Sequence, residues 1–281
     1  MKLVHTVEKV RHLVLEAKAA CDAVGLVPTM GALHEGHLTL IKKALEECSF
    51  VVVSVFVNPT QFGPSEDFDK YPRTLQADAV ACQSAGVDVV FAPSAEEMYP
   101  DGYNSWVEVG GITADLEGAL RPIHFRGVAT VCTKLFGIVN PDIAFFGQKD
   151  YQQLTVIKKM VKDLNFPLEI RRVDTVREAD GLAMSSRNRY LSSEERASAL
   201  VLSKSLFAAK DAYESGVRDS ESICKRALEV LASEPAFAPD YFVIRDAETL
   251  ATVDKIEKPI VALVAGKLGT VRLIDNVVLG E

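Results

Sequence analysis

Short runs of β-branched residues alternate with longer amphipathic segments through the first part of the sequence, and this alternation constrains the fold most strongly. The run FVVVSVFV at residues 50–57 is apolar on both faces, as expected of a strand buried in a parallel sheet. Runs of the same kind predict strands at residues 25–28, 87–92, 142–146 and 169–176. Apolar residues at helical spacing predict helices at residues 37–48, 75–85, 128–139 and 151–164. The pattern predicts an α/β fold with a doubly wound parallel sheet, whose ligand binds at the carboxyl ends of the strands.

The composition changes after residue 176. The polar stretch READGLAMSSRN (residues 177–188) has neither strand nor helix period, so we place a domain boundary near residue 175. Beyond it, SSEE at residues 192–195 predicts the capped start of a long helix that runs towards Tyr213. A second helix is expected at residues 220–233, and strands at 241–245, 259–264 and 270–279. The prediction is a first domain over residues 1–175 and a smaller C-terminal α+β domain over residues 176–281 that covers the active site.

Charge and cysteine content narrow the class of protein. Among 281 residues, 31 Lys and Arg stand against 39 Asp and Glu, and the net charge of −8 disfavours extended binding to nucleic acid or to an anionic membrane. The five cysteines include no CxxC pair and are expected to be reduced. No apolar run approaches the ~20 residues that span a bilayer, and charges interrupt the first residues too often for a signal peptide. These features predict a cytoplasmic protein.

The segment PTMGALHEGH (residues 28–37) joins the first predicted strand to the first predicted helix. At such a junction a helix N-terminus offers free backbone N–H groups and partial positive charge to an anion. Gly31 and Gly36 would let the backbone approach a phosphate, and His34 and His37 can face one pocket. The glycines have Walker A spacing, but the Lys and Ser/Thr of that motif are missing, which argues against a P-loop NTPase. A plain strand-turn-helix junction and a zinc site at the two histidines are the alternatives.

Three further segments place polar side chains after strands or in the polar stretch. Asn58 and Gln61 directly follow the run at 50–57 and can hydrogen-bond a polar ligand, although a turn that caps its own backbone explains them equally well. Lys149 and Asp150 stand at a helix start, where they can bind phosphate and ribose. A surface lysine and an ordinary helix-start aspartate are the alternative.

MSSRN, at residues 184–188, supplies two hydroxyls and a guanidinium suited to a terminal phosphate. The alternative is a polar linker without a ligand.

Taken together, these segments resemble a known family. PTMGALHEGH is similar to the HIGH-type signature of adenylyl-transferring Rossmann enzymes, and MSSRN to their KMSKS-type element. Six segments in order resemble the pantothenate synthetase (pantoate-β-alanine ligase) family: PTMGALHEGH, FVNPTQF, YPRT, HFRGV, GQKDYQQL and GLAMSSRNRYL. The resemblance extends from about Gly25 to RLIDN at residues 272–276. It implies a Rossmann-like first domain and a homodimer.

The implied reaction is the ATP-dependent condensation of pantoate with β-alanine, which gives pantothenate, AMP and pyrophosphate through an enzyme-bound pantoyl adenylate. Mg²⁺ would be held mainly by the phosphates of ATP, with no protein ligand assigned. A loop around residues 62–71 would close over the intermediate and exclude water.

The resemblance also implies site residues. The catalytic set is His34, His37, Lys149, Ser185, Ser186 and Arg187. The ATP-binding set is Met30, Gly31, Ala32, Leu33, His34, Glu35, Gly36, His37, Gly147, Gln148, Lys149, Asp150, Val176, Met184, Ser185, Ser186 and Arg187. Pantoate would bind to Gln61 and Gln153, and β-alanine to Gln61 and Asn58.

Three other functions remain to be separated from this one. A nucleotidyltransferase of the same superfamily would keep the nucleotide in its product. A non-catalytic nucleotide sensor would retain the fold without turnover. A tRNA synthetase is disfavoured because no basic tRNA-binding appendage is visible in the sequence.

Overall fold

The computed structural model describes residues 1–64 and 66–281, which form two compact units. Unit 1 comprises Met1–Gly147 and Val156–Asp174, and unit 2 comprises Gln148–Thr155 and Thr175–Glu281. The chain therefore enters unit 2 briefly after Gly147 and returns to it for good after Asp174. Sequence periodicity gave no sign of this excursion, and the domain boundary near residue 175 stays a prediction.

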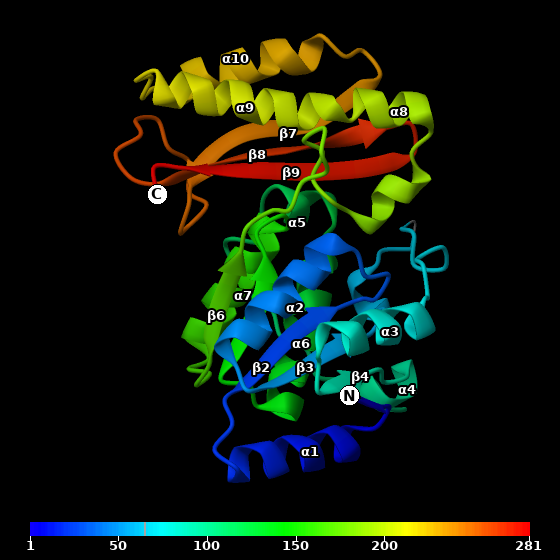
Figure 1. Cartoon of the computed structure of the whole chain (residues 1–281). Coiled ribbons are helices and arrows are strands. Elements are labelled where there is room, and N and C mark those ends of the chain that lie inside the picture. Colours follow the sequence, from blue (N-terminus) through cyan, green and yellow to red (C-terminus); the bar gives the residue numbers. More distant parts are fainter. Residues whose placement is uncertain (65) are drawn as a thin grey trace. The chain divides into compact units, whose positions relative to one another are not determined.

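Unit 1 is built on a six-stranded sheet in the order β1-β4-β3-β2-β5-β6 (Figure 1). All its strand pairs are parallel, which confirms the predicted α/β class and doubly wound sheet. The strands are β1 (Lys2–Val4), β2 (Val24–Thr29), β3 (Phe50–Val55), β4 (Val89–Phe91), β5 (Ile143–Gly147) and β6 (Glu169–Val173).

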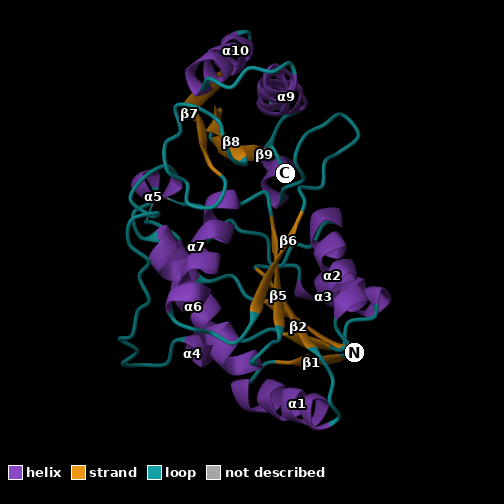
Figure 2. Cartoon of the chain, turned by 90° about the vertical axis from the view of Figure 1, so that its left-hand side faces the viewer, coloured by secondary structure: helices purple, strands orange, loops and turns teal. Residues whose placement is uncertain are grey.

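Helices cover both faces of this sheet. The helices of unit 1 are α1 (Val7–Ala19), α2 (Glu35–Glu47), α3 (Leu75–Ala85), α4 (Ala95–Met98), α5 (Glu117–Leu120), α6 (His124–Val139) and α7 (Tyr151–Asp163), and the first residues of α7 belong to unit 2. Figure 2 shows α2 and α3 on one face of the sheet and α6 on the other. On the first face, Ile41 of α2 packs in a buried cluster with Val27, Val53 and Phe145 of three neighbouring strands. The apolar run at residues 50–57 thus forms a strand, β3, that is buried on both faces.

The order of the strands locates the expected ligand-binding edge of unit 1. Successive strands β2, β3 and β4 run outward in one direction, and β5 and β6 in the other, so the order reverses between β2 and β5. Ligands of doubly wound sheets bind at the carboxyl ends of the strands beside such a reversal. Those ends are Thr29 in β2, Val55 in β3 and Gly147 in β5. PTMGALHEGH and FVNPTQF leave the sheet at two of them.

Unit 2 is a small α+β unit, as predicted. Its antiparallel sheet has the order β7-β8-β9, formed by β7 (Phe237–Asp246), β8 (Ile260–Leu268) and β9 (Val271–Leu279). Its helices are α8 (Ser193–Ser198), α9 (Leu200–Glu214) and α10 (Ser220–Ala232). Figure 1 shows α9 and α10 along one face of the sheet, where Leu206 and Ile223 are buried against Ile260 and Val264.

The structure differs from the predicted elements in several places. β1 and α1 precede the strand that we expected to be first, because a three-residue strand is too short to show a period. The predicted helix from residue 192 is capped by Ser192 and Glu195 as expected, but it divides at Ala199. There the Leu202 N–H bonds to the Ala199 carbonyl three residues back, which interrupts the i to i−4 pattern. Helix α6 begins at His124 rather than at residue 128.

Among the described residues, no helix combines the length and the apolar character needed to cross a membrane.

Candidate active site

The turn between β2 and α2 carries the PTMGALH sequence, and hydrogen bonds to Thr29 and Asp78 hold its backbone. Gly31 and Ala32 both have left-handed conformations, with φ of +82° and +51°. The Gly31 N–H donates to Thr29 Oγ1 at 3.1 Å, and the N–H groups of Ala32 and Leu33 donate to Asp78 at 3.0 and 2.8 Å. Left-handed backbone at a non-glycine residue costs about 1–2 kcal/mol, so these bonds offset the strain of the turn.

Asp78 is a functional candidate that the sequence did not reveal. It lies in the first turn of α3, is only 3% exposed, and accepts a further bond from Thr74 Oγ1 at 3.1 Å. From the sequence alone, an acidic residue there is typical of a helix start. Only the fold shows that both of its carboxylate oxygens hold the turn before α2.

The two histidines of this segment are fixed by the start of α2. His34 is the N-cap residue, and its Nδ1 accepts from the Gly36 N–H at 3.2 Å. His37 Nδ1 accepts in return from the His34 N–H at 3.3 Å, and the ring centroids are 4.1 Å apart. A nitrogen that accepts a hydrogen bond carries no proton, so the proton of each neutral ring lies on Nε2. Both rings therefore present Nε2–H as a donor.

Five backbone N–H groups in and around the start of α2 are engaged within the protein. The N–H groups of residues 31–34 and of Gly36 all donate within the protein. These five groups are therefore already engaged, whereas the imidazole side chains supply Nε2–H donors.

Asn58 is the N-cap of a short 3₁₀ helix, η1 (Pro59–Gln61), that follows β3, and Gln61 is the last residue of this helix. Asn58 is 1% exposed, and its Nδ2 donates to Gln61 Oε1 at 3.1 Å. The Tyr99 hydroxyl donates to Asn58 Oδ1 at 2.9 Å, and burial raises the pKa of Tyr99 to about 12, so this donor stays protonated. Gln61 Nε2 points at the Met30 sulfur, 3.0 Å away. Asn58 thus orients the Gln61 amide beside Met30, another predicted site residue.

The HFRGV segment supports the same turn from α6. His124 Nδ1 donates to the Gln61 carbonyl at 3.0 Å, and Asn58 Nδ2 also donates to the Gly127 carbonyl at 3.2 Å. Gly127 packs so closely that an added Cβ would lie 2.5 Å from the Gln61 Cα. A glycine is therefore required for α6 to meet η1.

The loop expected to close over the intermediate, residues 62–71, includes Ser65, which lies outside the described residues. Within its described part, Glu66 receives two 2.7 Å hydrogen bonds from Arg121. Burial opposes ionisation of Glu66, but the guanidinium outweighs it and holds the pKa of this carboxyl below its usual value. The loop is thus anchored to the segment that precedes α6.

In unit 2, a small hairpin brings two predicted ATP-binding residues together. The Met184 N–H donates to the Val176 carbonyl at 3.0 Å, and Arg177 pairs with Ala183 in an antiparallel bridge. Immediately after it, Ser185 caps the 3₁₀ helix η2 (Ser186–Tyr190) by accepting from the Arg187 N–H at 3.3 Å. The MSSRN segment therefore continues from this hairpin into η2.

The predicted site residues fall in both units. Unit 1 holds Met30, Gly31, Ala32, Leu33, His34, Glu35, Gly36, His37, Asn58, Gln61 and Gly147. Unit 2 holds Gln148, Lys149, Asp150, Gln153, Val176, Met184, Ser185, Ser186 and Arg187. Their roles in binding and catalysis remain predictions.

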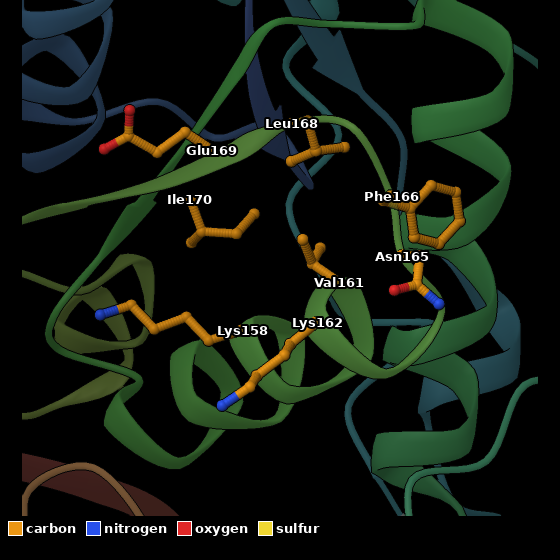
Figure 3. A pocket seen from close by; sticks show the side chains of 8 residues that line it. All are labelled: Lys158, Val161, Lys162, Asn165, Phe166, Leu168, Glu169 and Ile170. Atoms are coloured by element: carbon orange, nitrogen blue, oxygen red, sulfur yellow. The ribbon is translucent and has the colours of Figure 1, made fainter.

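A cavity of about 590 Å³ lies elsewhere in unit 1, where Lys158, Lys162 and Phe166 meet the start of β6 (Figure 3). The other lining residues are Val161, Asn165, Leu168, Glu169 and Ile170. It lies at the amino end of its strand, whereas ligands of such sheets bind at the carboxyl ends. No predicted site residue lines it.

Metal-binding side chains do not cluster in the described part of the chain: no group of three His, Cys, Asp or Glu residues there is placed to hold an ion. The Nδ1 atoms of His34 and His37 both face backbone N–H groups.

Comparisons with known proteins identify the family of the chain. The family model described as pantoate-beta-alanine ligase matches residues 2–278. The chain belongs to the pantoate-β-alanine ligase family. The ligase is 52% identical over 281 residues to the pantothenate synthetase of Pelotomaculum thermopropionicum, with all of both chains covered. It is 56% identical over 259 residues to that of Acidobacterium capsulatum, covering 92% of this chain and 87% of the relative.

Two solved structures extend the comparison. The crystal structure of pantothenate synthetase from Thermus thermophilus matches the ligase with a TM-score of 0.93 at 48% identity, covering 99% of each chain. That of the pantoate-beta-alanine ligase from Francisella tularensis, complexed with beta-gamma ATP and beta-alanine, matches with a TM-score of 0.81 at 35% identity, over 99% of this chain and 97% of the other. The Rossmann-like fold expected from the sequence is confirmed by these matches.

Proposed function

We propose that this ligase joins pantoate to β-alanine at the expense of ATP and releases pantothenate, AMP and pyrophosphate. The observation that carries the proposal is the family match along residues 2–278. The Francisella relative, whose structure holds an ATP ligand and β-alanine, supports ATP and β-alanine as ligands. We also propose that the protein is a homodimer and that it is cytoplasmic. Its proposed domains span residues 1–175 and 176–281.

The first step activates an unreactive carboxylate. A pantoate carboxylate oxygen attacks the α-phosphorus of ATP, a new O–P bond forms, and the bond from that phosphorus to pyrophosphate breaks. Charge grows on the phosphoryl oxygens, so catalysis requires positioning and charge stabilisation more than a protein nucleophile. His34 and His37 suit this step because their Nε2–H donors are pre-oriented by the capping box.

The second step transfers the acyl group. The amine of β-alanine attacks the acyl carbon of pantoyl adenylate, a C–N bond forms, and the C–O bond to AMP breaks while the nitrogen loses a proton. Gln61 would hold pantoate through its amide, which Asn58 orients, and both residues would border β-alanine. Gln153, in the first turn of α7, would bind pantoate as well. The loop at residues 62–71 would keep water from the adenylate.

Further residues would bind the nucleotide. Lys149, Ser185, Ser186 and Arg187 would hold phosphate oxygens, Gly147 and Asp150 the ribose, and Val176 the adenine. The other backbone and side-chain contacts to ATP would come from Met30, Gly31, Ala32, Leu33, Glu35, Gly36, Gln148 and Met184.

Mg²⁺ fits this donor set as an ion that arrives with ATP. The predicted phosphate-binding side chains are imidazoles, a lysine, hydroxyls and a guanidinium, and the described residues hold no cluster of three metal-binding side chains. Mg²⁺ is commonly bound through substrate phosphates in this way. When bound, it would neutralise charge on the departing pyrophosphate.

A product assay separates this proposal from the alternatives. With ATP, Mg²⁺, pantoate and β-alanine, we expect AMP, pyrophosphate and pantothenate in equal amounts, with no ADP. A nucleotidyltransferase would instead leave AMP attached to its product, and a nucleotide sensor would consume no ATP. Either of those results would overturn the proposed reaction.

A further inference from the structure

The side chain of Asn276, in β9, forms hydrogen bonds with the backbone of Gln148 and Lys149. Its Nδ2 donates both hydrogens to two consecutive carbonyls, that of Gln148 at 3.0 Å and that of Lys149 at 2.8 Å. Its Oδ1 accepts from Gln148 Nε2 at 3.2 Å. All three residues belong to unit 2, and Asn276 is 1% exposed. Each polar atom of this side chain is therefore used to hold the turn that precedes α7.

The position of Asn276 in β9 places it outside the apolar cluster of unit 2. Side chains alternate between the two faces of a strand, and Leu273 and Leu279 pack into the apolar cluster beneath α9 and α10. Asn276 is one residue out of phase with them and faces the other side of the sheet. A buried polar group is tolerated at such a position when its hydrogen bonds are satisfied, as they are here.

The preceding residue anchors a second predicted phosphate-binding element. Asp275 is 2% exposed and receives two bonds from the Arg177 guanidinium, at 2.6 and 3.1 Å. Arg177 also donates to the Gly181 carbonyl at 3.1 Å, across the hairpin that leads into MSSRN. Burial raises the pKa of Asp275, while Arg177 and the charge of Lys149 act in the opposite direction. Two consecutive residues of β9 thus hold the Lys149 turn and the hairpin before Ser185.

We propose that Asn276 is a positioning residue for adenylation, which acts by fixing the backbone at Gln148 and Lys149 so that the lysine meets the phosphates of ATP. The proposal rests on the proposed function, in which Lys149 binds phosphate oxygens. Neither Asn276 nor Asp275 is required to touch a substrate. The RLIDN segment (residues 272–276) then holds the backbone at Gln148 and Lys149 in place.

A double-mutant cycle tests this proposal. The variants are Asn276→Ala, Lys149→Ala and the double variant, and the readout is pantoate-dependent exchange of pyrophosphate into ATP. Because a misplacement of about 1 Å costs up to ~10²-fold in rate, we expect Asn276→Ala to slow exchange by ~10- to 100-fold. In the Lys149→Ala background the same substitution should change the rate by no more than about twofold, because residues that act through one another are not additive.

The control is Leu273→Ala, which removes a buried side chain from the same strand without touching the lysine turn. It should lower the thermal unfolding midpoint yet keep the exchange rate near that of the parent enzyme. If Asn276→Ala fails to fold, Asn276→Ser, which retains one donor, enters the same cycle.

The outcomes separate the two proposals. A Lys149→Ala enzyme that exchanges at the parent rate removes the lysine from the proposed function. A slow Lys149→Ala enzyme in which Asn276→Ala still costs its full factor overturns the positioning role alone.

Discussion

Replacement of His37 by alanine is expected to lower the rate of adenylation by ~10²-fold or more, the usual loss when a preorganised donor to a developing charge is removed. This ring has one observed role, in the helix cap, and one proposed role, in catalysis. Nδ1 accepts the His34 N–H in the capping box, and Nε2 carries the proton that would reach the phosphoryl oxygens. Loss of the cap alone costs about 1 kcal/mol of stability. Single-turnover formation of AMP, measured beside a urea unfolding curve, separates the two effects.

Two further variants divide the tasks of His37. Asparagine places its amide oxygen near the position of Nδ1, so His37→Asn should keep the cap and the stability but remain slow. Glutamine reaches the position of Nε2, so His37→Gln should recover part of the rate. An alanine variant with near wild-type turnover would remove His37 from the mechanism.

Gly127→Ala is expected to have a large effect although Gly127 is assigned no contact with a substrate. The added Cβ would lie 2.5 Å from both the Gln61 Cα and the Thr60 carbonyl oxygen, so α6 and η1 must move apart. Overpacking of this kind costs about 1–3 kcal/mol of unfolding free energy. Because the displaced turn carries Gln61, we also expect a raised KM for pantoate with the KM for ATP little changed, as expected for Gln61→Ala itself.

Gly137→Ala is the matched control for this prediction. It lies in the same helix α6, and its added Cβ would meet no atom within 4 Å. Alanine is the better helix former, so this variant should be neutral or more stable by up to about 1 kcal/mol. If Gly127→Ala changed the free energy of unfolding and the KM for pantoate as little as Gly137→Ala does, the inferred close packing of α6 on η1 would be contradicted.

The parts of the fold that the sequence predicted are those set by local pattern. The buried run at residues 50–57 became β3, the helix at residues 75–85 matched α3, and the capping box at Ser192 was confirmed because caps and periodicity are short-range properties. The three-residue β1 was missed because its pairing with β4, far along the chain, is what makes it a strand.

In the candidate site, too, the sequence revealed only what local pattern sets. His34 and His37 stand out in the sequence because they share one turn, whereas the groups that hold the site come from distant positions. Asp78 holds the turn before α2, His124 holds Gln61, and Asn276 holds the carbonyl of Lys149. Separations of 46, 63 and 127 residues carry no local signal. The two hydrogen bonds from the N–H groups of Ala32 and Leu33 to Asp78 could not be foreseen for the same reason.

The most direct test of the proposed reaction is pyrophosphate-ATP isotope exchange with Mg²⁺ and pantoate but without β-alanine, repeated without pantoate. Reversible formation of an acyl adenylate predicts exchange that requires pantoate and proceeds in the absence of the amine. No exchange in the presence of pantoate, or exchange that does not depend on it, would contradict an amine-independent pantoyl adenylate and with it the proposed order of chemical steps.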